Sequence, residues 1–146
     1  MPTARSTRTI AAPAGEVWEL VSDPHHLPRW WPRVARVEGV ERDAFTQVLA
    51  SPRGRLVRAD FHVVAADERA LRLVWGQEVE GTPFARVLAA SETELRLQPA
   101  GRGTEVTIEL RQSLHGAFAR LGARRVRRAG LATLQEALDG LERVLG

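Results

Sequence analysis

The sequence predicts an α+β fold in which a curved antiparallel sheet of about seven strands wraps around one long C-terminal helix. The first observation is the stretch 113–145, which lacks proline and is rich in Ala, Leu, Arg and Glu. Its apolar residues recur at helical spacing, typical of one buried face: Leu134, Leu138, Leu141 and Leu145. The second observation is that much of the preceding chain alternates apolar and polar residues, as half-buried strands do. Strands and a helix of this kind cover each other's apolar faces.

Two short helices are predicted between the first strand and the rest of the sheet. Residues 3–10 alternate weakly and are expected to form an edge strand. A helix is expected to open at residues 12–16, because proline is tolerated in a first turn and an acidic residue there suits the helix dipole. It should end at residues 22–24, since a residue that precedes proline leaves the helical region. Residues 25–32 predict a second short helical turn.

Six further strands are predicted from residue 34 onward. They are expected near residues 34–40, 45–50, 56–65, 71–79, 84–98 and 104–112. The last of these gives the clearest alternation, with Val106, Ile108 and Leu110 on its apolar face. Residues 84–98 fit either one long strand or a hairpin that folds at residues 91–93, and one strand is favoured.

The C-terminal helix is predicted to bend or rotate near Ala129 and Gly130. Upstream of this point a second stripe steps by four residues: Phe118, Gly122, Val126 and Gly130. At about 100° per residue, the two stripes are offset by roughly a quarter turn. Two small residues lie at the offset, and a glycine there costs roughly 1 kcal/mol in helix propensity.

Length and composition indicate one domain, residues 1–146, with no internal repeat or linker. The N-terminus lacks the apolar core of a signal peptide, and no run approaches the roughly 18 apolar residues of a membrane span. A cytoplasmic location is therefore expected. Cysteine is absent, which excludes disulfides, thiol catalysis and Cys-ligated zinc.

The pI near 11.0 does not indicate a strongly basic protein. The net charge is only +3, and all 21 basic residues are arginine. Because the chain has no Lys, Tyr or Cys, almost nothing titrates between His and Arg, and a small positive excess persists to high pH.

Short motifs follow one another in a recognisable order along the chain. They are IAAPAGEVW at residues 10–18, SDP at 22–24, LPRWWP at 27–32 and GTEVT at 103–107. With this set the chain resembles the START-like or Bet v 1-like superfamily (SRPBCC), often labelled polyketide cyclase/dehydrase-like. The resemblance implies a helix-grip fold with a cavity between sheet and helix, closed at one end by the two short helices. Members bind hydrophobic small molecules; some catalyse aromatic cyclisation or dehydration, and others are lipid carriers or co-chaperones.

Inward-facing strand residues and the long helix are expected to line such a cavity. The candidates are Trp30, Val57, Ala59, Phe61, Leu73, Trp75, Val106, Ile108, Phe118, Gly122, Val126 and Gly130, with Leu71 and Leu110 as further candidates. The small residues at 122, 129 and 130 either leave room for a ligand or only allow the sheet to approach closely. Trp30 and Trp31 form either a lid or membrane-touching tip, or a pair with one ring packed under the short helix and one partly exposed.

Candidate catalytic residues are few. His25 and His26, beside Asp23, are the one concentration of acid–base groups, and either histidine would serve as a general base if it faced the cavity mouth. The alternative is a pair of solvated loop histidines. No third ligand lies at a familiar spacing, so no metal is predicted, and no cofactor motif is present. Arg86 is a weaker polar candidate. Cyclases of the superfamily tend to use Tyr and Asn, among other residues, and this chain contains neither.

The strongest charge feature is a group of arginines near the start of the predicted helix. By helical angle one face carries Arg120, Arg124, Arg127 and Arg128, with Arg125 beside it. This face suits an anionic membrane or an acidic partner, and the alternative is a solvated basic face. No aromatic residues interleave the arginines and no nucleic-acid motif occurs, so nucleic-acid binding is not predicted.

The sequence thus favours a binding or carrier protein that holds a small hydrophobic ligand without changing it. The alternative is a cyclase/dehydrase-like enzyme that acts on a hydrophobic substrate in the same cavity. A third hypothesis is an interaction domain whose basic helix face docks an acidic partner. An apolar cavity lining would favour the carrier protein, whereas a histidine or carboxylate that points into the cavity would favour the enzyme.

Overall fold

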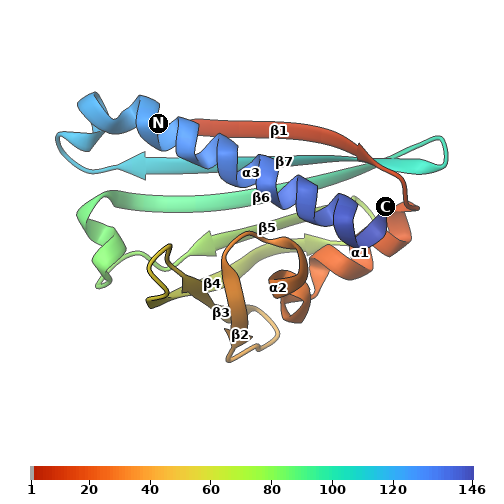
Figure 1. The fold of residues 1–146 in the computed structure, drawn as a ribbon, viewed down its shortest axis with the longest axis horizontal. Helices are drawn as coiled ribbons and strands as arrows, with labels where there is room; N and C mark the ends of the chain where they lie inside the picture. Colours follow the sequence, from red (N-terminus) through yellow and green to blue (C-terminus); the bar gives the residue numbers. More distant parts are fainter. Residues whose placement is uncertain (1) are drawn as a thin grey trace.

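The computed structural model describes residues 2–146, apart from the side chain of residue 118. Its strands are β1 (Thr3–Ile10), β2 (Val34–Glu38), β3 (Ala44–Ala50), β4 (Leu56–Asp67), β5 (Arg72–Gln77), β6 (Leu88–Ala100) and β7 (Gly103–Leu114). Its helical segments are α1 (Ala14–Ser22), η1 (Pro24–His26), α2 (Leu27–Trp30), η2 (Pro83–Arg86), η3 (Phe118–Gly122) and α3 (Ala123–Leu145). Figure 1 shows that α3 crosses one face of the sheet and that α1 and α2 gather at its C-terminal end.

The seven strands form one antiparallel sheet in the order β1-β7-β6-β5-β4-β3-β2. The chain runs as a meander from β2 to β7, and β1 then pairs with β7 at the far edge, from Thr3↔Arg111 to Ile10↔Thr104. This confirms the predicted α+β arrangement: an antiparallel sheet, short helices after the first strand and a long C-terminal helix. It also confirms that residues 3–10 form an edge strand.

The core lies between the sheet and the C-terminal half of α3. Sheet residues and α3 leucines meet there with no exposed surface: Ile10, Leu95, Val106, Ile108, Leu134, Leu138 and Leu141. Each such side chain contributes roughly 1.5–3 kcal/mol by leaving water. The leucine stripe of the sequence is therefore the buried face of α3, except that its last member, Leu145, is only half-buried.

The start of the C-terminal helix differs from the prediction. Ser113 and Leu114 belong to β7, where they pair with Ala90 and Leu88 of β6, and α3 begins only at Ala123. A π-helical turn, η3, precedes α3. Such a turn holds more residues than an α-turn and rotates the following stripe. Phe118 and Gly122 of the upstream stripe lie in this turn, whereas Val126 and Gly130 belong to α3, which continues as one helix through Ala129 and Gly130.

The long strand predicted near residues 84–98 is confirmed as one strand, β6, with a shifted start. Pro83–Arg86 instead form the short helix η2, with proline in the first turn, where its missing N–H is tolerated. Of the two interpretations of Trp30 and Trp31, the structure agrees with the one in which one ring is packed and the other is partly exposed. Trp30 is buried, Trp31 is half-buried, and their rings meet edge to face at 5.4 Å.

Candidate functional site

A pocket of about 450 Å³ lies beneath the N-terminal half of α3. Five elements and the segments beside them supply its wall: Val57 of β4, Pro83 and Phe84 of η2, Val87 and Leu88 at the start of β6, Leu110 and Gln112 of β7, and Val126, Ala129, Gly130 and Thr133 of α3. It opens at the surface, because Pro83 and Ala129 are exposed. The wall includes Pro83 and Phe84 of η2, the green helical turn that lies in Figure 1 at the end of the sheet opposite α1.

The lining of this pocket is apolar. Nine of its eleven residues are apolar, and the two polar side chains, Gln112 and Thr133, are neutral. No residue of the wall carries an ionisable group. The pocket can therefore bury an apolar ligand and offer it one or two hydrogen bonds, but it presents no acid or base.

Small residues of α3 form the roof of the pocket. A Cβ added at Gly130 would lie 3.3 Å from both the Ala4 Cβ and the Leu110 Cδ2, so glycine lets α3 approach β1 and β7 closely. The neighbouring Ala129 leaves space on the side of the mouth.

The structure distributes the predicted cavity residues over two regions. Val57, Val126 and Gly130 line the pocket, as does the further candidate Leu110. Others are buried in the core away from it: Trp30, Ala59, Leu73, Trp75, Val106 and Ile108. Phe61 is half-buried and stacks on Phe45, Leu71 is half-buried against the core, and Gly122 borders a separate shallow hollow. The side chain of Phe118 lies outside the described residues.

Sequence reasoning missed the part of the wall that comes from residues 83–88. These residues were expected to be a turn and a strand, and their helical turn η2 brings Phe84 to the mouth. The signal in the sequence was Pro83 after Gly81 and Thr82, which is typical of a first helical turn. Gln112 and Thr133 were also missed, because polar residues were not expected in the lining.

The two candidate histidines do not lie at the pocket. Asp23 caps η1, and its Oδ1 accepts from the His25 backbone N–H at 3.0 Å and lies 2.9 Å from His25 Nδ1. Burial opposes ionisation of Asp23, but these hydrogen bonds outweigh it and hold the pKa of its carboxyl below the ordinary value. η1 leads into α2, which packs against the far end of α3. His25 is exposed and His26 half-buried.

The third catalytic candidate, Arg86, is closer to the pocket. It is the last residue of η2, two positions after Phe84, and its side chain is exposed and outside the wall. Among residues 2–146, no cluster of three or more His, Cys, Asp or Glu side chains is arranged to hold a metal ion.

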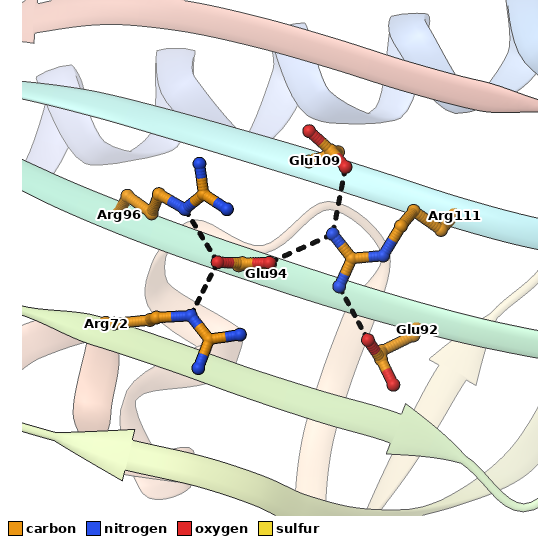
Figure 2. Close-up of polar contacts among 6 residues, drawn as sticks. All are labelled: Arg72, Glu92, Glu94, Arg96, Glu109 and Arg111. Atoms are coloured by element: carbon orange, nitrogen blue, oxygen red, sulfur yellow. Dashed lines mark hydrogen bonds and ion pairs between the residues drawn. The ribbon is translucent and has the colours of Figure 1, made fainter.

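A second group of charged residues lies on the outer face of the sheet, away from α3 (Figure 2). Glu94 of β6 is only 3% exposed and accepts from three arginines of neighbouring positions, at 2.7–2.9 Å: Arg72, Arg96 and Arg111. Arg111 also donates to Glu92 and Glu109. Burial opposes ionisation of Glu94, yet the three arginines outweigh it and lower the pKa of its carboxyl to about 2. Each Glu94 oxygen is already engaged, so we assign this network to the stability of the sheet.

An open antiparallel sheet, a long helix across it and an apolar pocket between them define an α+β protein of the helix-grip class. The family model described as "Polyketide cyclase / dehydrase and lipid transport" matches residues 1–146, and the chain belongs to that family. No curated protein sequence matches the chain. None of the helices in residues 2–146 is both long enough and apolar enough to span a membrane.

Solved structures share the fold at low sequence identity. A protein from Thermus thermophilus is 26% identical, with a TM-score of 0.78 over 97% of this chain and 95% of that one. A START superfamily protein from Mycobacterium smegmatis is 15% identical, with a TM-score of 0.79 over 99% and 97%. The di-domain ARO/CYC protein BexL from the BE-7585A biosynthetic pathway is 22% identical, with a TM-score of 0.81 over 98% of this chain and 46% of that one.

Proposed function

We propose that this protein carries a small hydrophobic molecule in the pocket beneath the N-terminal half of α3, without changing it chemically. The observation that supports this most directly is the wall, in which nine of eleven residues are apolar and none is ionisable. The volume of about 450 Å³ lies within the range of roughly 300–1,000 Å³ that is usual for small-molecule sites. The cytoplasm is the expected compartment.

The same wall argues against acid–base catalysis. A general acid or base has to come within hydrogen-bond reach of the atom that gains or loses a proton, roughly 2.6–3.2 Å. Gln112 and Thr133 can orient a ligand through a hydrogen bond, but neither exchanges a proton readily near neutral pH. His25 and His26 belong to η1, which leads into α2, and neither is among the residues that line the pocket.

A cyclase or dehydrase-like activity is the second candidate. It is supported by the family description and by the similarity of fold to ARO/CYC proteins. In this chain such chemistry would depend on Arg86, the one ionisable candidate on an element that borders the pocket. Its side chain would have to turn inward over Phe84 when a substrate is bound.

The proposed binding of a hydrophobic ligand can be tested by placing a bulky side chain in the pocket and measuring the binding of a probe. Ala129→Phe places a ring at the mouth, and Ala132→Phe makes the same change at an exposed α3 position outside the wall. Binding of the neutral fluorescent probe N-phenyl-1-naphthylamine should weaken at least ~10-fold in the first variant, by the exclusion of apolar contact, and stay near that of the parent protein in the second. Equal binding by both variants would place the probe elsewhere and contradict the proposal.

Native mass spectrometry separates the two candidate functions. The freshly purified protein should carry an adduct that leaves on mild organic extraction, and a carrier should return that compound unchanged after incubation. A change in the mass of the bound compound that depends on Arg86, tested with Arg86→Ala, would favour the enzyme.

A further inference from the structure

We propose that the start of α3 and the preceding turn η3 dock on an anionic lipid bilayer. The surface consists of five exposed arginines and one exposed leucine, which we call the arginine patch: Arg120, Leu121, Arg124, Arg125, Arg127 and Arg128. It lies at the end of the molecule that holds the mouth of the pocket.

The charge of the arginine patch is uncompensated. Residues 110–135 contain no Asp or Glu, and none of the ion pairs found among residues 2–146 includes an arginine of the patch. Arg127 Nε donates to the Thr3 carbonyl oxygen at 3.2 Å, which fixes its position but leaves its charge. By contrast, Arg111 on the outer face of the sheet is held by carboxylates of three glutamates. The patch therefore attracts anions from solution.

The arginines are also placed where they disfavour the helix. The first turn of a helix carries partial positive charge, so basic residues there are unfavourable and acidic residues are preferred. α3 has no acidic residue in its first turn and begins with Ala123, Arg124 and Arg125. Apart from the Arg127 hydrogen bond to Thr3, no side-chain hydrogen bond or ion pair found among residues 2–146 joins these arginines to the rest of the fold, which indicates a role outside the fold.

Leu121 favours a bilayer over an acidic protein or nucleic acid as the partner. Its side chain is 85% exposed, more than any other large apolar side chain described. It borders a shallow hollow together with Ala117, Gly122 and Arg125. A lone apolar side chain among arginines matches the boundary between lipid headgroups and acyl chains, where cations meet phosphate and the apolar group inserts.

The helical geometry relates the patch to the pocket. Arg124 and Arg128 lie on roughly the opposite side of α3 from Val126, which faces the pocket. Arg125 lies one helical turn before Ala129, which lines the pocket. If α3 rests on a bilayer through its outer side, the mouth opens beside the headgroups. Docking itself does not require a ligand and is measured independently of the proposed carriage.

The test is sedimentation with vesicles, at low ionic strength and again at about 0.15 M salt. The parent protein should bind phosphatidylglycerol/phosphatidylcholine vesicles and not pure phosphatidylcholine, and salt should weaken binding. The double variant Arg124→Glu/Arg128→Glu should weaken binding to the anionic vesicles at least ~30-fold. Each basic residue near an anionic membrane surface raises the membrane affinity about fivefold, and the variant also replaces two positive charges with negative ones. The matched control is Arg69→Glu/Arg102→Glu, which makes the same change in net charge at two exposed turns at the opposite end of the sheet. Its binding should stay within about threefold of the parent.

Leu121→Ser supplies a second, charge-neutral variant and should weaken vesicle binding while leaving the thermal unfolding temperature unchanged. Absence of vesicle binding by the parent at low salt would overturn the proposal. So would equal losses in the two double variants, which would show an effect of net charge alone. Equal binding to polyglutamate or DNA, unaffected by Leu121→Ser, would assign the patch to an acidic macromolecule instead. Ala129→Phe should block the pocket and keep vesicle binding, so that failure of carriage and failure of docking are distinguishable.

Discussion

Gly140 of α3 lies directly against the main chain of Trp30 in α2: a Cβ on Gly140 would stand 2.1 Å from the Trp30 carbonyl oxygen. Because backbone atoms cannot yield as a flexible side chain does, this contact fixes how closely α2 approaches α3. It also holds the buried Trp30 ring at the end of the core that the two short helices close.

Gly140→Ala is expected to destabilise the protein by roughly 1–3 kcal/mol or more, the usual cost of forcing extra volume into a packed site. The gain in helix propensity, about 1 kcal/mol for alanine over glycine, is too small to offset it. Gly15→Ala is the control, because nothing lies within 4 Å of a Cβ at that helical position. It should stabilise by about 0.4–1 kcal/mol. Urea unfolding measures both, and equal effects would contradict the close contact.

Glu94 gives the protein a stability that depends on pH. The folded-state pKa of about 2 lies below the ordinary value of 4.5, so the native state favours the ionised carboxylate. The stabilisation is fully present above about pH 4.5 and is lost as the pH falls toward 2. Glu94→Gln should lower the free energy of unfolding at neutral pH by about 3 kcal/mol, because three arginines lose their shared partner.

The same variant should also flatten the fall in stability between pH 4.5 and pH 2. Urea midpoints at several pH values in this window measure the slope. Glu19→Gln, at an exposed position of α1, is the matched substitution and should leave the slope as it is in the parent. If Glu94→Gln unfolds with the same acid dependence as the parent, the network does not hold the carboxylate ionised.

Thr104 links the last strand to the loop after the first. Its side chain is fully buried and its Oγ1 donates to the Ala12 carbonyl oxygen at 2.7 Å. Thr104→Val keeps the shape but leaves that carbonyl without this donor, which should cost about 1–3 kcal/mol. Thr9→Val, on the exposed side of β1, should be nearly neutral. Thermal unfolding compares the two, and equal shifts would argue that the buried bond contributes nothing.

The native tryptophans are poorly placed to report on the proposed ligand. None of Trp18, Trp30, Trp31 and Trp75 belongs to the wall of the pocket. Phe84→Trp puts an indole at the mouth, and its emission should shift to shorter wavelength when an apolar compound fills the pocket. The parent protein should change little under the same titration. An equal response from both would indicate that the compound binds near the native tryptophans.

The fold could be predicted because the apolar residues of the sequence recur with two clear periods, one helical and one typical of strands. The leucines at 134, 138 and 141 have the helical period and are all buried, and residues 104–112 alternate as β7 does. The start of α3 could not be predicted in the same way. Ser113 and Leu114 extend β7 because β6 offers them partners, and a pairing between distant segments leaves no local signal.

The candidate site was harder to predict for a geometrical reason. Alternation shows which side chains of a strand face inward, but not which end of the sheet stays uncovered. Trp75 and Val57 both belong to the inward face. Trp31 packs on Trp75, with ring centroids 5.7 Å apart, and closes that end, whereas Val57 borders the pocket. The arginine patch, in contrast, was visible directly because its residues are close in sequence.

The pairing of β1 has a consequence for the order in which the protein can fold. β1 is synthesised before the other strands of the sheet, but its one neighbour in the sheet, β7, and the helix that packs on it lie about 100 residues or more further along the chain. The loop after β1 is also joined to the residue that follows α3, because the Ala11 N–H donates to the Gly146 carbonyl oxygen at 3.2 Å. While the ribosome is still extending the chain, the meander from β2 to β6 can assemble, but β1 has no strand to join. Closing the sheet is then a late event that waits for the synthesis of β7 and α3, and contacts between such distant segments form slowly.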